Sequence, residues 1–179
     1  MLLEGSQNPS RRTAFTVILV RHYGRWVSMV PSFANTLFEA ALHRGVEGLP
    51  RARVIRREVP LGGSLIDFQI EGSFGRALVE VKSATLVSAG RALFPDAPTA
   101  RGTRHVRELI AHRREGGLAF LVFVVQRSDA TSLSPHAGHD PAFAAALLEA
   151  EQAGVMILAF TCEVRPKGIT LDRRIPVVL

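Results

Sequence analysis

The sequence predicts a mixed α/β fold, in which helices cover a sheet that contains both parallel and antiparallel strands. Stretches with alternating apolar and polar residues, typical of half-buried strands, are interspersed with stretches of helical spacing. Residues 118–125 are apolar throughout, which is typical of a strand in the middle of a sheet. The length of 179 residues suits one domain with a sizeable core. We therefore expect a single domain over residues 13–179, preceded by a flexible polar tail over residues 1–12.

The elements follow from local patterns taken in order along the chain. Tyr23-Gly24 separates the first two strands, and a Gly-containing turn at 72–75 joins two later ones into an antiparallel meander. Asp140-Pro141 is typical of a capped helix start. Strands are expected over residues 14–22, 25–30, 52–59, 64–71, 76–82, 118–125 and 155–163, with closing strands after them. Helices are expected over residues 31–43, 101–115 and 142–153, with a long loop over residues 83–100.

Composition and charge exclude several functional classes. No apolar run reaches the roughly 18 residues of a membrane span, and a single cysteine excludes a disulfide scaffold. The first residues lack the pattern of a secretory signal, so we expect a cytoplasmic protein. The net charge of +6 favours an anionic partner. Only two of the 22 basic residues are lysines, Lys82 and Lys167. Because the chain otherwise uses arginine for positive charge, a lysine suggests a role that arginine could not fill.

A pair of acidic residues is predicted by the register of one hairpin. If Ser73 and Phe74 form a two-residue turn, residues whose numbers sum to 147 lie opposite each other, and Asp67 then opposes Glu80. Opposed side chains lie roughly 4.5 to 5.5 Å apart at Cβ, close enough for two carboxylates to share one divalent cation. Ile66, Phe68 and Ile70, with Ala77, Val79 and Val81, then fill the opposite, apolar face.

Lys82 lies two residues after Glu80 and therefore shares its face of the strand. Two carboxylates and an ammonium are what metal-dependent hydrolysis of a phosphodiester needs. The carboxylates bind Mg²⁺ or Mn²⁺, and the ammonium activates a water or stabilises negative charge. A cross-strand Glu-Lys face with a solvated Asp67 is the alternative interpretation of the same three residues.

These residues resemble two nested families. Asp67 followed by Glu80-Val81-Lys82 looks like the PD-(D/E)xK nuclease superfamily, without the proline before the first acid. Within it, a longer pattern is similar to the sugar fermentation stimulation protein family. The matching residues are Ile66-Asp67-Phe68, Glu80-Val81-Lys82-Ser83, Thr85-Leu86, Phe94-Pro95-Asp96-Ala97, Thr99, Arg101-Gly102, His105 and Glu108-Leu109, with weaker similarity from about residue 13 to the C-terminus.

The resemblance implies a restriction-endonuclease-like core, non-specific DNA binding and a regulatory link to maltose metabolism. Family members usually carry an N-terminal OB-like domain with an Asn-Thr-Gly signature, and we expect this chain to lack it. Glu58 matches a family acid, so it is a third candidate metal ligand or else a strand-edge charge. Glu39, on the first helix, is one residue away from the family pattern and is interpreted as a surface charge.

The candidate contacts to nucleic acid are basic residues on one helix and one strand. Arg101, Arg104 and His105 lie on the second helix, where Arg101 suits a phosphate and His105 a phosphate or leaving group. Arg56 belongs to a basic cluster on a strand, which either follows a phosphate backbone or protects a sheet edge. Asp96, in the preceding loop, could cap that helix, support a metal or hold Arg101.

The function predicted from these residues is a Mg²⁺- or Mn²⁺-dependent nuclease that acts on DNA or RNA without sequence preference. Asp67, Glu80 and Lys82 are its predicted catalytic residues, and Asp67, Glu80 and Glu58 its predicted metal ligands. A DNA-binding regulator of sugar metabolism that keeps the nuclease fold but does not cut is the competing interpretation.

Overall fold

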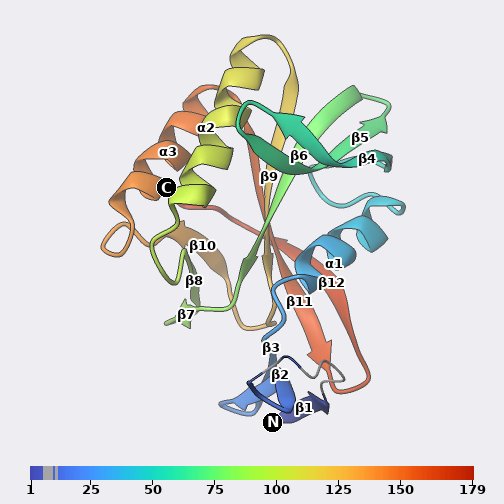
Figure 1. Ribbon diagram of the computed structural model, residues 1–179, viewed down its shortest axis with the longest axis vertical. Coiled ribbons are helices and arrows are strands. Elements are labelled where there is room, and N and C mark those ends of the chain that lie inside the picture. Colours follow the sequence, from blue (N-terminus) through green and yellow to red (C-terminus); the bar gives the residue numbers. More distant parts are fainter. Residues whose placement is uncertain (6–9, 11) are drawn as a thin grey trace.

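A computed structural model describes residues 1–5, 10 and 12–179 of the protein. Its centre is a six-stranded mixed sheet with helices on both faces (Figure 1), which confirms the predicted fold class. The helices are α1 (Phe33–Leu42), α2 (Ala100–Arg114) and α3 (Pro141–Gln152). The strands are β1 (Leu2–Gly5), β2 (Phe15–His22), β3 (Arg25–Ser28), β4 (Ala52–Leu61), β5 (Ser64–Gly72), β6 (Gly75–Ala84), β7 (Val87–Ser88), β8 (Arg91–Phe94), β9 (Leu118–Val125), β10 (Ser132–Pro135), β11 (Met156–Arg165) and β12 (Gly168–Ile175).

The large sheet has the strand order β12-β11-β9-β6-β5-β4. β4, β5 and β6 form the predicted antiparallel meander. β6, β9 and β11 run parallel, and β12 returns antiparallel to β11. The crossover from β6 to β9 contains α2 and the crossover from β9 to β11 contains α3. Because such crossovers are right-handed, both helices lie on the same face of the sheet, and α1 covers the other (Figure 1).

Two apolar cores lie against the two faces of the large sheet. β9 contributes to both, because its side chains alternate in direction. Leu121 and Phe123 pack on the side of α2 and α3, whereas Val122 and Val124 pack on the side of α1. All four side chains are fully buried. The prediction of a central buried strand over these residues is thereby confirmed.

The starts of α2 and α3 are fixed by side-chain caps that also join these two helices. Asp140 accepts a hydrogen bond from Phe143 N at 2.9 Å and so caps α3, as predicted. Its other oxygen accepts from Thr99 N at 2.7 Å, and Thr99 Oγ1 in turn accepts from Gly102 N at 3.0 Å at the start of α2. The bonds from Thr99 and Phe143 hold the pKa of Asp140 below its usual value. No helix in the described part of the chain combines the length and apolar character needed to cross a membrane.

Two small sheets differ from the prediction. Leu2–Gly5, within the segment expected to be a flexible tail, forms β1 and pairs with β2. Residues 6–9 and 11 of that segment lie outside the described residues. The long loop expected over residues 83–100 contains β7 and β8, and β8 pairs with β10. These strands have four residues or fewer, and every residue of β1 is exposed, so no apolar periodicity marks them.

At Asp67, the alternation of β5 side chains between the two faces of the sheet is interrupted. This irregularity lies at the candidate site. Phe68 packs in the core on the side of α1, as predicted, but Ile66 packs in the core on the side of α2. The prediction that both share one face is therefore wrong for Ile66. On the neighbouring strand, Glu58 has φ of 50°, in the left-handed region, and the β4 ladder has a register shift. Irregularities of this kind bend a strand and redirect its side chains.

Candidate active site

The candidate site begins where β5 and β6 separate. The observed register has Phe68 opposite Val79, which confirms the hairpin register predicted from the sequence. Beyond that pair the two acidic side chains replace the backbone ladder. Asp67 Oδ2 accepts from Val81 N at 2.8 Å, and Glu80 Oε2 lies 3.3 Å from Asp67 N. The carboxylates of Asp67 and Glu80 are thus held at one junction, each by the backbone of the other strand.

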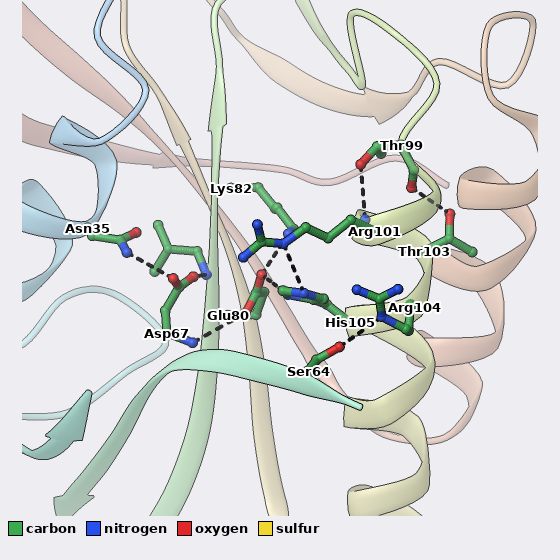
Figure 2. Close-up of polar contacts among 12 residues, drawn as sticks. Asn35, Ser64, Asp67, Glu80, Lys82, Thr99, Arg101, Thr103, Arg104 and His105 are labelled. Carbon is green, nitrogen blue, oxygen red and sulfur yellow. Dashed lines mark hydrogen bonds and ion pairs between the residues drawn. The ribbon is translucent and has the colours of Figure 1, made fainter. Parts of the chain in front are cut away.

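Glu80 is the centre of a buried polar cluster on the face of β6 that α2 covers (Figure 2). Its Oε1 lies 2.6 Å from Lys82 Nζ on the same strand and 2.6 Å from His105 Nδ1 on α2. The Glu80 and His105 side chains are each 3% exposed, and that of Lys82 is 14% exposed. Alternation along β6 places Glu80 and Lys82 on one face, as the sequence predicts. The structure brings His105 to the same carboxylate.

His105 uses both ring nitrogens inside the protein. Arg101 Nε lies 3.3 Å from His105 Nε2, and because a guanidinium only donates, Nε2 is the acceptor. The ring proton is therefore on Nδ1 and is donated to Glu80 Oε1. We expected His105 to contact a phosphate or a leaving group, and in this structure both its ring nitrogens are used by Glu80 and Arg101. The sequence places His105 on the second helix, and the packing of α2 against β6 brings its ring to Glu80.

Arg101 and Arg104 point from α2 toward this cluster and remain exposed (Figure 2). Among the described residues, neither guanidinium forms an ion pair with a carboxylate. Arg104 Nε donates to Ser64 Oγ at 3.0 Å, and Gly63 N donates to Glu108 Oε1 at 2.9 Å. These two bonds attach the turn between β4 and β5 to α2. The turn between β4 and β5 is therefore held against α2, beside the exposed arginines.

Asn35 on α1 is a site residue that the sequence did not reveal. Its Nδ2 donates to Asp67 Oδ1 at 2.9 Å, from the face of the sheet opposite α2 (Figure 2). Burial and the neighbouring Glu80 charge raise the pKa of Asp67 above its usual value, although the hydrogen bonds from Val81 and Asn35 oppose this. Asn35 lies one helical turn before Glu39, so a search of the same helix face for any polar side chain could have found it.

Other candidates lie outside the cluster. Glu39 forms an ion pair with Arg57, in agreement with its interpretation as a surface charge. Glu58 and Arg56 are exposed on β4. Within the described residues, no three His, Cys, Asp or Glu side chains converge as a metal site, so Glu58 does not join the two acids. Asp96 is exposed and does not cap α2, since Thr99 does.

The donor set of the site fits a hard divalent cation. Mg²⁺ retains several of its waters and is commonly held by one or two carboxylates, and Asp67 and Glu80 supply two carboxylates at this junction. Both carboxylates are held at the same junction of β5 and β6, and burial together with the Glu80 charge raises the pKa of Asp67. A bound cation would relieve the repulsion between the two carboxylates.

Known proteins resemble the chain over nearly its whole length. A family model for the sugar fermentation stimulation protein RE domain matches residues 32–168. A sugar fermentation stimulation protein homolog of Moorella thermoacetica is 44% identical over 172 residues, covering 95% of this chain and 74% of that protein. A homolog of Chloroflexus aurantiacus is 42% identical over 178 residues, covering 99% of this chain and 69% of that protein. The structure of Pyrococcus furiosus SfsA in complex with Ca²⁺ matches with a TM-score of 0.88 and 30% identity, covering 99% of this chain and 77% of that one. The chain belongs to the sugar fermentation stimulation protein (SfsA) family.

Proposed function

We propose that this chain is a divalent-metal-dependent nuclease that hydrolyses phosphodiester bonds of DNA or RNA and binds nucleic acid without sequence preference. The observation that carries the proposal is the clustering of the Asp67 and Glu80 carboxylates with the Lys82 ammonium at one junction of β5 and β6. Structural ion pairs are usually more exposed than this one and do not need two acids. Such a cluster under exposed arginines suits phosphate chemistry.

Each side chain has a role that follows from its surroundings. Asp67 and Glu80 would hold Mg²⁺ or Mn²⁺, which when bound polarises a phosphate oxygen and lowers the pKa of a water. Asn35 and Val81 N orient Asp67, and His105 orients Glu80, so neither carboxylate has to reorganise. Lys82 is placed to orient a water or to stabilise charge that develops on the phosphate.

The choice of lysine at position 82 agrees with this role. An ammonium can give up a proton to its surroundings, whereas a guanidinium stays charged at any ordinary pH. The chain uses arginine for nearly every other cation. Lys82 lies in the cluster, while Lys167, the second lysine, is exposed in the turn between β11 and β12. The two lysines therefore provide a natural comparison of site and surface.

Substrate contacts are assigned to the exposed arginines beside the cluster. Arg101 and Arg104 on α2 would contact phosphates on either side of the scissile bond, and Arg56 on β4 would contact the backbone farther away. These contacts carry no base readout, so binding should be non-specific and should weaken as salt rises.

The relative from Pyrococcus furiosus supports the metal part of the proposal. It has the same fold as this chain and is described in complex with Ca²⁺. Ca²⁺ and Mg²⁺ both prefer oxygen ligands, and they differ in size and in how readily they give up water. By similarity, we assign this chain a cation site made by its own carboxylate pair.

Cleavage of labelled single-stranded DNA, double-stranded DNA and RNA by the purified chain tests the proposal. We expect cutting with Mg²⁺ or Mn²⁺ and none with EDTA. The rate of cutting by Lys82→Ala should be lower than that of the wild type by about 100-fold or more. Lys167→Ala is the matched control and should cut like the wild type. If the wild type cuts none of the three polymers while retaining DNA in a salt-dependent way, the nuclease proposal is wrong. The chain would then be a binding protein with the fold of a nuclease.

A further inference from the structure

The turn between β2 and β3 presents a tyrosine to solvent among basic residues. Tyr23 is 93% exposed, the most exposed of the large apolar or aromatic side chains described. Arg21, His22 and Arg25 surround it in the sequence, and all three are exposed. The hairpin lies at the end of the molecule away from the β4–β5–β6 meander (Figure 1). It therefore forms an aromatic and basic tip that the candidate active site does not use.

The backbone at this tip is unfavourable for the residue it carries. Tyr23 has φ of 45° and Gly24 has φ of 78°, so both central residues of the turn are left-handed. Turns of this type favour Asn-Gly, because a side chain with a Cβ and a large ring is strained at positive φ. The exposed ring of Tyr23 recovers none of this cost by burial. Strain retained at an exposed position is a reason to look for a function.

Neighbouring side chains support the tip. The rings of His22 and Tyr23 meet edge to face, with centroids 4.5 Å apart. Arg21 Nε donates to Gly24 O at 3.3 Å across the turn. His22 pairs with Arg25 in the β2–β3 ladder. The Tyr23 ring and the Arg21 guanidinium are thus each supported by a neighbour within the turn.

We propose that this tip, made of Arg21, His22, Tyr23 and Arg25, binds single-stranded nucleic acid. A base would stack on the Tyr23 ring, and the two guanidinium groups would contact the phosphates on either side of it. Exposed aromatic rings within a basic surface bind single strands in this way, and stacking tolerates any base. A duplex keeps its bases stacked on one another, so it offers only its phosphates to the same tip. The inference rests on the proposed function only in taking nucleic acid as the ligand, and it does not require that the chain cleave it.

A cavity lies between the hairpin and the main domain. Its volume is about 280 Å³, and His22 lines it from the hairpin. Thr85 and Asp96 line it from the main domain. Thr85 follows Lys82 by three residues, and Asp96 precedes Arg101 by five. The guanidinium of Arg127 also lines the cavity, so a strand held at the tip would meet a further cation there as well as the carboxylate of Asp96.

The chain contains one tyrosine, which makes the proposal directly measurable. Uniform labelling with 3-fluorotyrosine gives one ¹⁹F resonance, from position 23. We would titrate the full chain in EDTA, where cleavage does not interfere, with a 12-nucleotide oligo(dT), with a 12-base-pair duplex and with heparin. Fluorescence anisotropy would give the dissociation constants of the same nucleic acids for the wild type, Tyr23→Asn and Arg114→Gln. The Tyr23→Asn variant keeps a favoured turn, and Arg114→Gln controls for loss of one exposed charge elsewhere.

We expect oligo(dT) to shift or broaden the ¹⁹F resonance, and duplex and heparin at equal saturation to leave it nearly unchanged. Tyr23→Asn should weaken oligo(dT) binding about fivefold or more, without lowering the thermal midpoint, and should change duplex binding no more than Arg114→Gln does. An unchanged resonance at saturating oligo(dT), or equal affinity of Tyr23→Asn and the wild type, would overturn the inference. Because these measurements need no metal, their result is independent of whether the chain cleaves nucleic acid.

Discussion

Replacing Lys82 by alanine removes the ammonium that lies 2.6 Å from Glu80 Oε1. Loss of one partner from a buried ion pair costs about 3 to 5 kcal/mol of folding free energy. Glu80 keeps His105 Nδ1 as a donor, and Lys82 reaches solvent in part, so a loss of about 2 kcal/mol is the better expectation here. In a domain of this size that corresponds to a fall of about 4 to 8 °C in thermal midpoint.

Added metal should reverse this loss. Without Lys82 the two carboxylates have no nearby ammonium, so a divalent cation faces less competing positive charge and binds more tightly. The rise in thermal midpoint on adding Mn²⁺ should therefore be larger in Lys82→Ala than in the wild type, because ligand stabilisation grows with affinity. Differential scanning fluorimetry in EDTA and across a Mn²⁺ series measures both quantities.

Lys167→Ala is the control for this experiment, because Lys167 is exposed in a turn. It should melt like the wild type in EDTA and gain the same amount from Mn²⁺. The reasoning is refuted if Lys82→Ala melts within about 1 °C of the wild type in EDTA. It is equally refuted if Mn²⁺ stabilises the variant no more than it stabilises the wild type.

Three further predictions follow from groups around the site and in the core. Asp67→Asn should raise the free energy of unfolding at neutral pH in EDTA, because burial and the Glu80 charge raise the pKa of Asp67 and so disfavour its ionised form in the folded state. The stability that the Asp67 carboxyl contributes falls as pH rises through its raised pKa. The gain from Asp67→Asn should therefore vanish at about pH 3, where the carboxyl is protonated in both the folded and the unfolded state. Urea denaturation that finds the same gain at neutral pH and at this acidic pH would contradict the prediction. Glu108→Ala should speed hydrogen exchange of the Gly63 amide about fivefold, since it removes the acceptor 2.9 Å away, and an unchanged rate by NMR would show that the turn is held by other contacts. Burial raises the pKa of the Cys162 thiol to about 12, so Ellman's reagent should react with it only after unfolding in urea, and rapid reaction of the native chain would contradict its burial.

Local patterns in the sequence predict the parts of the fold that depend on neighbours along the chain. The apolar run of β9, the Asp140 cap of α3 and the hairpin register that opposes Phe68 to Val79 all have short-range causes, and all are found in the structure. That register brought Asp67 and Glu80 together as candidates. A tight turn fixes which residues oppose one another whatever lies around it.

The features that the sequence did not reveal depend on how elements pack. His105 becomes a partner of Glu80 because α2 lies against β6, and Asn35 reaches Asp67 because α1 covers the opposite face. Ile66 packs in a different core from Phe68 beside an irregular part of β4, where Glu58 has a positive φ that no residue pattern predicts. Strands as short as β8 and β10 form by pairing with each other, although they are distant in sequence.

Binding of Mn²⁺ by the Asp67–Glu80 pair is the central claim, and electron paramagnetic resonance measures it directly because bound Mn²⁺ loses most of its free-ion signal. The wild type and Lys167→Ala should bind Mn²⁺ with the same affinity, and folded Asp67→Asn and Glu80→Gln should each bind it at least about tenfold more weakly. Equal Mn²⁺ binding by all four proteins would place the cation elsewhere and contradict the assignment of this site.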